Sequence, residues 1–152
     1  MNERFKKLTD RMPLRLLSLL EQPLIAIDDI GITQVPQKGV YVFFEGNNPI
    51  YVGRSNRLKN RLKEHSQRSS GRYSATLAFR IAKQNTSTLQ KKQTNEQLMK
   101  NRDFVEEFEA AKDRIARTKI RFIGIEDQIE QAMFEIYVHL ALGTELNDFS
   151  TH

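Results

Sequence analysis

One stretch of the chain, residues 39–65, constrains its fold more than any other. It opens with two short runs of β-branched and aromatic residues at 40–44 and 49–52. A Gly46-Asn47-Asn48 turn separates the runs, so the pair is predicted to form a β-hairpin. Directly after the second run the chain turns at Gly53 and enters a strongly basic segment.

The hairpin carries one tyrosine on each expected strand. Successive side chains of a strand point to opposite faces, which places Tyr41 with Phe43 and Tyr51 with Gly53. With an odd-length loop centred on Gly46, Tyr41 and Tyr51 are expected to lie opposite each other on the same face. Two phenols beside an arginine-rich helix are unusual for packing alone.

The basic segment covers residues 54–68 and contains only one acid, Glu64. Its six basic residues are Arg54, Arg57, Lys59, Arg61, Lys63 and Arg68. The segment therefore carries as much net charge as the whole chain, +5 at pH 7. A polyanion is expected to be attracted to it.

A helix is predicted over roughly residues 57–66, with Ser55 or Asn56 as its cap. One narrow arc of this helix would hold Arg57, Arg61, His65 and Arg68. Leu58 and Leu62 lie beside that arc and are expected to anchor the helix to the sheet. The helix would then present a row of cationic groups next to its buried seam.

Length and composition fit a single domain over residues 1–152. The chain has no cysteine, which excludes disulfide scaffolds and thiolate metal sites. No signal peptide is expected, and the sequence shows no apolar run long enough for a transmembrane helix and no internal repeat. A cytoplasmic protein without membrane contact is expected.

The flanking segments complete a predicted α/β (α+β) fold, a small and mainly antiparallel three-stranded sheet flanked by helices. Residues 1–36 form a helical preface, in which Pro13 suits the first turn of a leucine-rich helix. Residues 74–117 form a helical insertion, with one long helix expected over 95–117. The third strand is predicted at 119–125 and the last helix at 128–142, ended by Gly143.

The acids of the last helix differ in what they can do. Asp127 and Glu130 have the spacing of an N-cap and its partner, which favours a structural role. Glu135 has no such role, and its helix is apolar almost all round. A carboxylate there is costly unless it is paired or bound to a cation. The alternative places Glu135 on a solvated stripe with Gln128 and Gln131.

The motifs together resemble the GIY-YIG nuclease family. The resemblance rests on Gly39-Val40-Tyr41 and Tyr51-Val52-Gly53, with Arg61 ten and His65 fourteen residues after Tyr51. Residues 119–147 are more loosely similar. There Glu135 and Asn147 fit the family's interval between a glutamate and an asparagine, although the usual proline before the asparagine is absent.

The resemblance implies metal-dependent hydrolysis of DNA phosphodiesters. Tyr51 would activate water with help from Tyr41, and Arg61 would hold the phosphate. Glu135 would bind Mg²⁺ or Mn²⁺, the metals that suit oxygen ligands. DNA contacts would come from Arg54, Arg57, Arg68 and Asn147.

Several alternatives stay open at this point. A strand tyrosine is usually a packing residue, and a phenol with a pKa near 10 needs nearby cations to act as a base. His65 could carry a proton, donate to a phosphate, or do neither.

The chain could also be a DNA-binding module that does not cleave, or a protein-interaction adaptor that uses the helix over 95–117. The choice of Tyr51 or Tyr41 as base, the DNA specificity, the pathway (repair, restriction or a mobile element) and the oligomeric state are left open.

Overall fold

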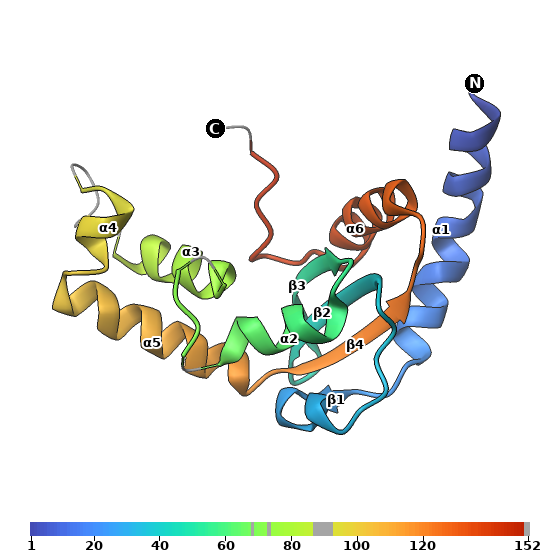
Figure 1. The fold of residues 1–152 in the computed structure, drawn as a ribbon. Coiled ribbons are helices and arrows are strands. Elements are labelled where there is room, and N and C mark those ends of the chain that lie inside the picture. Colours follow the sequence, from blue (N-terminus) through green and yellow to red (C-terminus); the bar gives the residue numbers. More distant parts are fainter. Residues whose placement is uncertain (68, 73, 87–92, 151–152) are drawn as a thin grey trace. The chain divides into compact units, whose positions relative to one another are not determined.

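The computed structural model describes residues 1–67, 69–72, 74–86 and 93–150 (Figure 1). The chain divides into two compact units. One unit comprises Met1–Lys59 with Thr118–His152 and contains every strand that the structure describes, so we call it the sheet unit. The other comprises Asn60–Arg117, and we call it the helical unit. That residues 1–152 form one domain with an insertion at 74–117 stays a prediction.

The sheet has four strands in the order β1-β4-β2-β3, and each neighbouring pair is antiparallel. The strands are β1 (Ile25–Ala26), β2 (Gly39–Glu45), β3 (Asn48–Ser55) and β4 (Lys119–Gly124). The predicted α+β fold is confirmed, but the predicted count of three strands is wrong. The additional strand, β1, is a two-residue pairing with the start of β4. So short a strand has no alternating pattern by which the sequence could indicate it.

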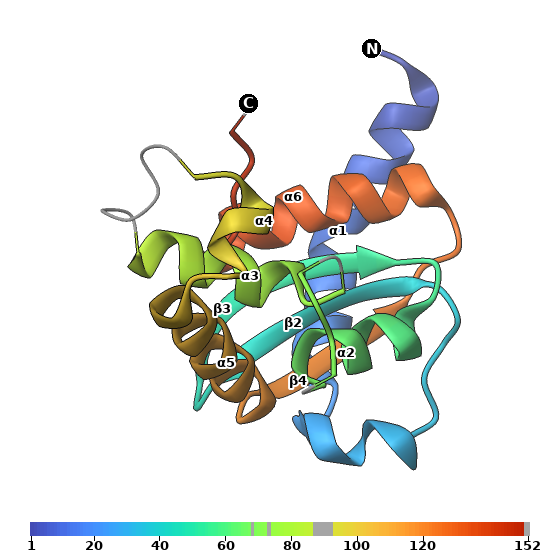
Figure 2. The same ribbon diagram turned by 60° about the vertical axis from the view of Figure 1, so that its left-hand side comes forward.

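One face of the sheet is covered by the helices α1 (Glu3–Glu21) and α6 (Gln128–Leu142). Figure 2 shows α6 lying alongside β3. Alternate residues of β2 point toward these helices and are completely or almost completely buried. The core of this layer contains Leu8, Met12, Leu19, Val40, Val42, Phe44, Val52, Ile123, Phe134 and Val138. The helix α6 is thereby fixed against the strand that carries Tyr51.

Helix α1 begins much earlier than Pro13, where the sequence predicted its first turn. Asn2 is its N-cap, and the Asn2 Oδ1 accepts a hydrogen bond of 3.1 Å from the Phe5 backbone N–H. Pro13 lies inside the helix, where it removes one backbone hydrogen bond. Leu8 and Met12 before that position and Leu19 after it are buried, which compensates for the loss.

Helix α6 has the predicted bounds and ends at Asp127 and Gly143 as predicted, but the Glu130 side chain pairs with arginines of α1 instead of completing the capping box. The Asp127 carboxylate accepts hydrogen bonds from the backbone N–H groups of Ile129 and Glu130. Gly143 ends the helix in the left-handed conformation, with φ of 66°.

The helical unit contains most of α2 (Leu58–Ser66) and all of α3 (Thr76–Asn85), α4 (Asn95–Leu98) and α5 (Arg102–Ala116). In the core of the helical unit, Phe79 packs edge-on against Phe104 and Phe108. The continuous helix predicted over residues 95–117 is instead two helices. Asn101 separates them, because its side chain accepts a hydrogen bond from the Phe104 backbone N–H and so caps α5.

None of the helices that the structure describes is long and apolar enough to cross a membrane.

Candidate active site

Tyr41 and Tyr51 lie on the same face of the hairpin, with 6.3 Å between their ring centroids. They do not lie directly opposite each other as predicted, because Tyr41 pairs with Gly53 and Tyr51 with Phe43. The two tyrosines are therefore diagonal neighbours. Phe43 fills the position between them, with its ring 5.4 Å from that of Tyr41 and 5.9 Å from that of Tyr51.

A β-bulge puts the two tyrosines on one face. Glu45 pairs with Asn48, so the turn is a two-residue loop, and Gly46 takes a φ of 59°. Continued without a shift, that register would pair Tyr41 with Val52 and send Tyr51 to the other face. The register instead shifts between Phe43 and Phe44, which leaves Ile50 as the extra residue of β3.

Two glycines of the hairpin are required by close packing. A Cβ at Gly39 would collide with the backbone carbonyl oxygen of Ile123 on β4. A Cβ at Gly53 would collide with the hydroxyl end of Tyr41. The glycine after Tyr51 and Val52 therefore makes room for the phenol of Tyr41 on the neighbouring strand.

Glu135 lies in the middle of α6 and faces Arg54 at the end of β3. The Arg54 Nε donates a hydrogen bond of 3.0 Å to Oε2 of Glu135. Oε1 accepts no hydrogen bond from the residues that the structure describes. Burial raises the pKa of Glu135, and the charge and hydrogen bond of Arg54 only partly oppose it. The side chain is 19% exposed, so this under-neutralised carboxylate can still be reached from solvent.

The other acids near the start of α6 have different surroundings. Glu130 is buried, and its oxygens lie 3.0 Å from the Arg15 Nε and 3.9 Å from an Arg11 Nη. The pKa of Asp127 is lowered, mainly by the hydrogen bond from the Glu130 backbone N–H. Glu126 is exposed and has a 3.6 Å contact with Lys38.

Asn147 holds the outer edge of β3 at Val52, next to Tyr51. Its Oδ1 accepts a hydrogen bond of 2.9 Å from the Val52 backbone N–H, and its Nδ2 donates one of 2.8 Å to the Val52 carbonyl oxygen. The Leu146 backbone N–H also donates to the carbonyl oxygen of Ile50. Asn147 therefore fixes the strand that carries Tyr51, and its predicted DNA contact stays a prediction.

Arg57 is exposed and comes just before α2, where its backbone N–H donates to the Ser55 hydroxyl. The leucines Leu58 and Leu62 are completely buried, and that they anchor the helix to the sheet stays a prediction. Arg68 lies outside the described residues.

Arg61 of the helical unit is fixed by three partners from its own unit. One Nη donates to the Ser74 carbonyl oxygen at 2.9 Å, and the other donates to the Thr76 hydroxyl at 2.6 Å. The Glu64 carboxylate lies 3.4 Å away. Ser74 and Thr76 were not predicted as partners of Arg61, since nothing in their spacing indicates a contact across the loop from α2 to α3. These contacts hold the guanidinium group in one orientation.

His65 is completely buried, so it does not belong to the predicted row of cationic groups beside the buried seam of the helix. It lies three residues after Leu62 and shares the buried face of α2 with it. Burial, together with the guanidinium groups of Arg61 and Arg80, lowers the pKa of His65 to about 3. The imidazole is therefore neutral at neutral pH, and its catalytic role stays a prediction.

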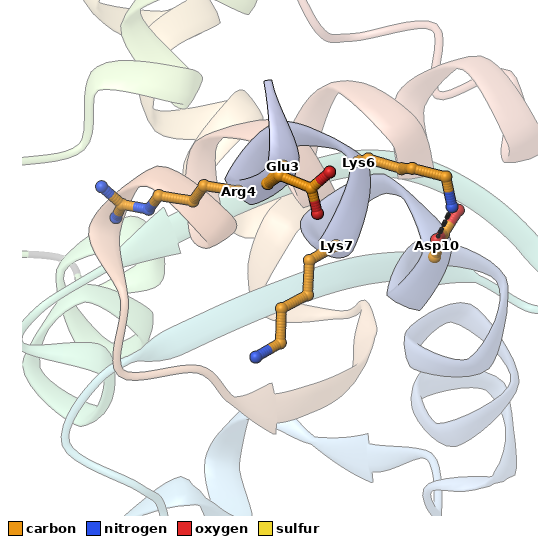
Figure 3. A pocket seen from close by; sticks show the side chains of 5 residues that line it. All are labelled: Glu3, Arg4, Lys6, Lys7 and Asp10. Carbon is orange, nitrogen blue, oxygen red and sulfur yellow. Dashed lines mark hydrogen bonds and ion pairs between the residues drawn. The ribbon is translucent and has the colours of Figure 1, made fainter. Parts of the chain in front are cut away.

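A hollow of about 500 Å³ lies beside the first turns of α1 (Figure 3). Glu3, Arg4, Lys6, Lys7 and Asp10 line it. Lys6 and Asp10 form an ion pair of 2.8 Å, and Arg4 pairs with Asp127. These ion pairs neutralise part of the positive charge there. In the described part of the chain, no three His, Asp or Glu side chains converge as a metal cluster.

The hairpin with its two tyrosines, followed by an arginine-bearing helix, defines the class of this protein. The family model of the GIY-YIG catalytic domain matches residues 37–117, which is more than half of the chain. The protein is a nuclease, and the chain belongs to the GIY-YIG family. The match includes the hairpin, α2 and the helical unit, whereas Glu135 and Asn147 lie beyond it.

Among solved structures, the chain is similar to the GIY-YIG N-terminal endonuclease domain of UvrC from Thermotoga maritima. That crystal structure is of a tyrosine-to-phenylalanine point mutant bound to its catalytic divalent cation. The sequences are 17% identical, the TM-score is 0.39, and the alignment covers 97% of this chain and 99% of that one. No curated protein sequence matches the chain significantly.

Proposed function

We propose that this chain is a metal-dependent endonuclease that hydrolyses DNA phosphodiesters with a divalent cation bound at Glu135. The observation that carries the proposal is the state of the Glu135 carboxylate. Burial disfavours its charge, one arginine contacts one of its oxygens, and the other oxygen accepts no hydrogen bond from the described residues. A bound cation would supply the missing neutralisation.

A divalent cation with oxygen ligands fits this position. Mg²⁺ keeps several waters and is commonly held by one or two carboxylates, so a single glutamate is a sufficient protein ligand. Mn²⁺ accepts the same donors. When bound, the metal would polarise the phosphate and stabilise the leaving oxygen.

Tyr51 is the proposed activator of the attacking water. Its side chain is partly exposed, whereas Tyr41 is almost completely buried against Phe43 and Gly53. A group that takes a proton from water has to be reachable by that water. The difference in exposure favours Tyr51 as the base and gives Tyr41 the role of positioning it.

Arginines would bind the DNA. Arg61 has a guanidinium group oriented by Ser74 and Thr76, which suits a directed contact with a phosphate. Arg57 is exposed and suits a phosphate outside the reacting centre. Arg54 could contact DNA once the cation has replaced it at Glu135.

The test of the proposed function is cleavage of supercoiled plasmid DNA with Mg²⁺, with Mn²⁺ and with a chelator. We expect cleavage only with metal. Tyr51→Phe keeps the ring and its packing, and should lower the cleavage rate by about 10²-fold or more, because it removes the proton acceptor. Tyr137→Phe is the matched control, since this tyrosine stacks on Phe134 within α6.

Two outcomes would contradict the proposal. Wild-type rates in Tyr51→Phe would assign proton abstraction to another group. Metal-independent DNA binding without cleavage under any of these conditions would instead favour a DNA-binding module that keeps the fold.

The DNA contact of Arg57 has its own test. Removing one phosphate contact flattens the slope of log affinity against log salt concentration by ~0.9. Arg57→Ala should show this change on duplex DNA. Arg102→Ala, whose side chain is 91% exposed on α5, is the control and should leave the slope unchanged. An unchanged slope in Arg57→Ala would remove this arginine from the DNA interface.

A further inference from the structure

A pocket of about 230 Å³ opens in the helical unit between the start of α3 and the start of α4. Arg72, Thr76, Phe79 and Asn95 line it. It is smaller than the clefts of ~300–1,000 Å³ that hold drug-sized ligands, so it has room for about one planar ring with its substituents. None of the four residues belongs to the predicted catalytic set.

The lining combines an aromatic wall with convergent polar groups, which is the usual composition of a ligand pocket. Phe79 is 8% exposed and its ring is held edge-on against Phe104 and Phe108, with centroids 5.2 and 6.0 Å away, so it offers a small but rigid apolar wall. Asn95 is exposed at the start of α4 and offers an amide that both donates and accepts. Arg72 contributes a mostly buried guanidinium group, which lies 3.8 Å from the exposed Glu96.

One contact connects this pocket to the proposed phosphate site. The Thr76 hydroxyl, which lines the pocket, accepts the 2.6 Å hydrogen bond from Arg61. Both residues belong to the helical unit, so this neighbourhood does not depend on the sheet unit. A DNA phosphate held by Arg61 would therefore place an adjoining nucleotide next to the pocket.

We propose that Arg72, Thr76, Phe79 and Asn95 form a subsite for one unpaired nucleotide next to the phosphate held by Arg61. The proposal rests on the function proposed above and specifies its substrate, DNA with an unpaired base beside the bound phosphate. A base in a duplex is stacked on both sides and cannot enter a walled pocket. An unpaired base can contact the Phe79 wall and present its edge to the Asn95 amide and the Arg72 guanidinium group, as such side chains read base edges.

The test measures binding without metal, so that no cleavage takes place. Full-length protein is titrated against a fully paired duplex and against the same duplex with one unpaired 2-aminopurine, whose fluorescence reports stacking. The wild type should bind the unpaired DNA about tenfold more tightly, the scale of one stacked or edge-bonded base, and should change the fluorescence. Arg72→Gln and Asn95→Ala should each reduce this preference severalfold.

Arg102→Gln is the matched control, because it removes an arginine from an exposed position of the same unit. It should keep the full preference for unpaired DNA. Thermal melting of each variant shows whether the fold is intact, and Asn95→Ala changes an exposed side chain in any case. Equal wild-type affinity for the two DNAs would overturn the subsite, as would an unchanged preference in both pocket variants.

Failure of the subsite and failure of the proposed function are distinguishable. Metal-dependent cleavage without any preference for the unpaired base would overturn the subsite alone. A preference that is lost in Arg72→Gln and Asn95→Ala, in a protein that cleaves no DNA, would support the subsite and overturn the nuclease mechanism at Glu135.

Discussion

Helix α6 carries two glutamates, Glu130 in its first turn and Glu135 in its middle, and the charges of their carboxylates are neutralised to different extents. In the first turn, Glu130 is buried and lies near two arginines of α1, Arg11 and Arg15. In the middle, Glu135 is less buried but has one arginine, Arg54, on one of its oxygens. The effect of burial on the pKa of Glu135 is larger than the opposing effect of Arg54, so the pKa is raised.

The difference separates a structural carboxylate from one that is available for a ligand. Both oxygens of Glu130 face arginines of the helix packed against α6, so the acid fastens α1 to α6. Glu135 pairs with no residue of another helix in the described part of the chain, and its partner Arg54 lies at the end of an edge strand. A carboxylate that is partly desolvated and incompletely paired attracts a cation.

The largest expected effect comes from Glu135→Gln, which keeps the shape and removes the charge. If the carboxylate holds the metal, cleavage should fall by about 10²-fold or more, because several kcal/mol of transition-state stabilisation is lost with the metal. Affinity for DNA should stay the same or rise, since one negative charge near the phosphates is gone. Plasmid cleavage and DNA titration measure the two effects.

Glu130→Gln is the matched control on the same helix and should retain metal-dependent cleavage at temperatures where it is folded. Retained cleavage in Glu135→Gln would remove the distinction between the two acids. Exposed Glu126 would then be the next candidate ligand.

For stability, the order of the two variants should be the reverse of that for cleavage: Glu130→Gln should be destabilised and Glu135→Gln should not. Glu130→Gln leaves Arg11 and Arg15 without their acid, and we expect a loss of roughly 1–3 kcal/mol in the free energy of unfolding. The loss is smaller than for a fully buried pair, because both arginines are partly exposed. Metal-free Glu135→Gln should melt at the same temperature as the wild type or higher, since a poorly neutralised charge has been removed.

Thermal melting without metal measures this difference, at ~2–4 °C per kcal/mol for a chain of this size. A larger loss in Glu135→Gln than in Glu130→Gln would mean that the pair with Arg54 is structural.

Much of the fold follows from local signals in the sequence. The hairpin, the buried Leu58 and Leu62, and the bounds of α6 were predictable, because alternation, helical periodicity and capping residues act over a few positions. The ion pair of Glu135 with Arg54 was not predictable in this way, because it joins two residues that are 81 positions apart.

The features that the sequence did not predict depend on contacts between residues far apart in the chain. The bulge at Ile50 is set by the pairing of β2 with β3 and decides which face Tyr51 occupies. The burial of His65 and the fixation of Arg61 depend on how α2 packs and on the loop to α3. No local pattern encodes such contacts, so helical periodicity alone grouped His65 with the arginines of the predicted cationic row.

The smallest expected effect concerns Arg54, the one partner of Glu135 among the described residues. In the structure its Nε donates to the same carboxylate that we propose as the metal ligand, so arginine and metal compete for it. Arg54→Gln removes the competitor and a positive charge nearby, and should tighten metal binding without DNA by about two- to tenfold. Titration of Mn²⁺, followed by electron paramagnetic resonance, measures this without any cleavage.

Arg57→Gln, which removes an equal charge just before α2, is the matched control and should change the Mn²⁺ affinity less. Unchanged or weaker Mn²⁺ binding in Arg54→Gln would show that the ion pair does not compete with the metal. The middle of α6 would then resemble its first turn, with Glu135 as a second structural carboxylate.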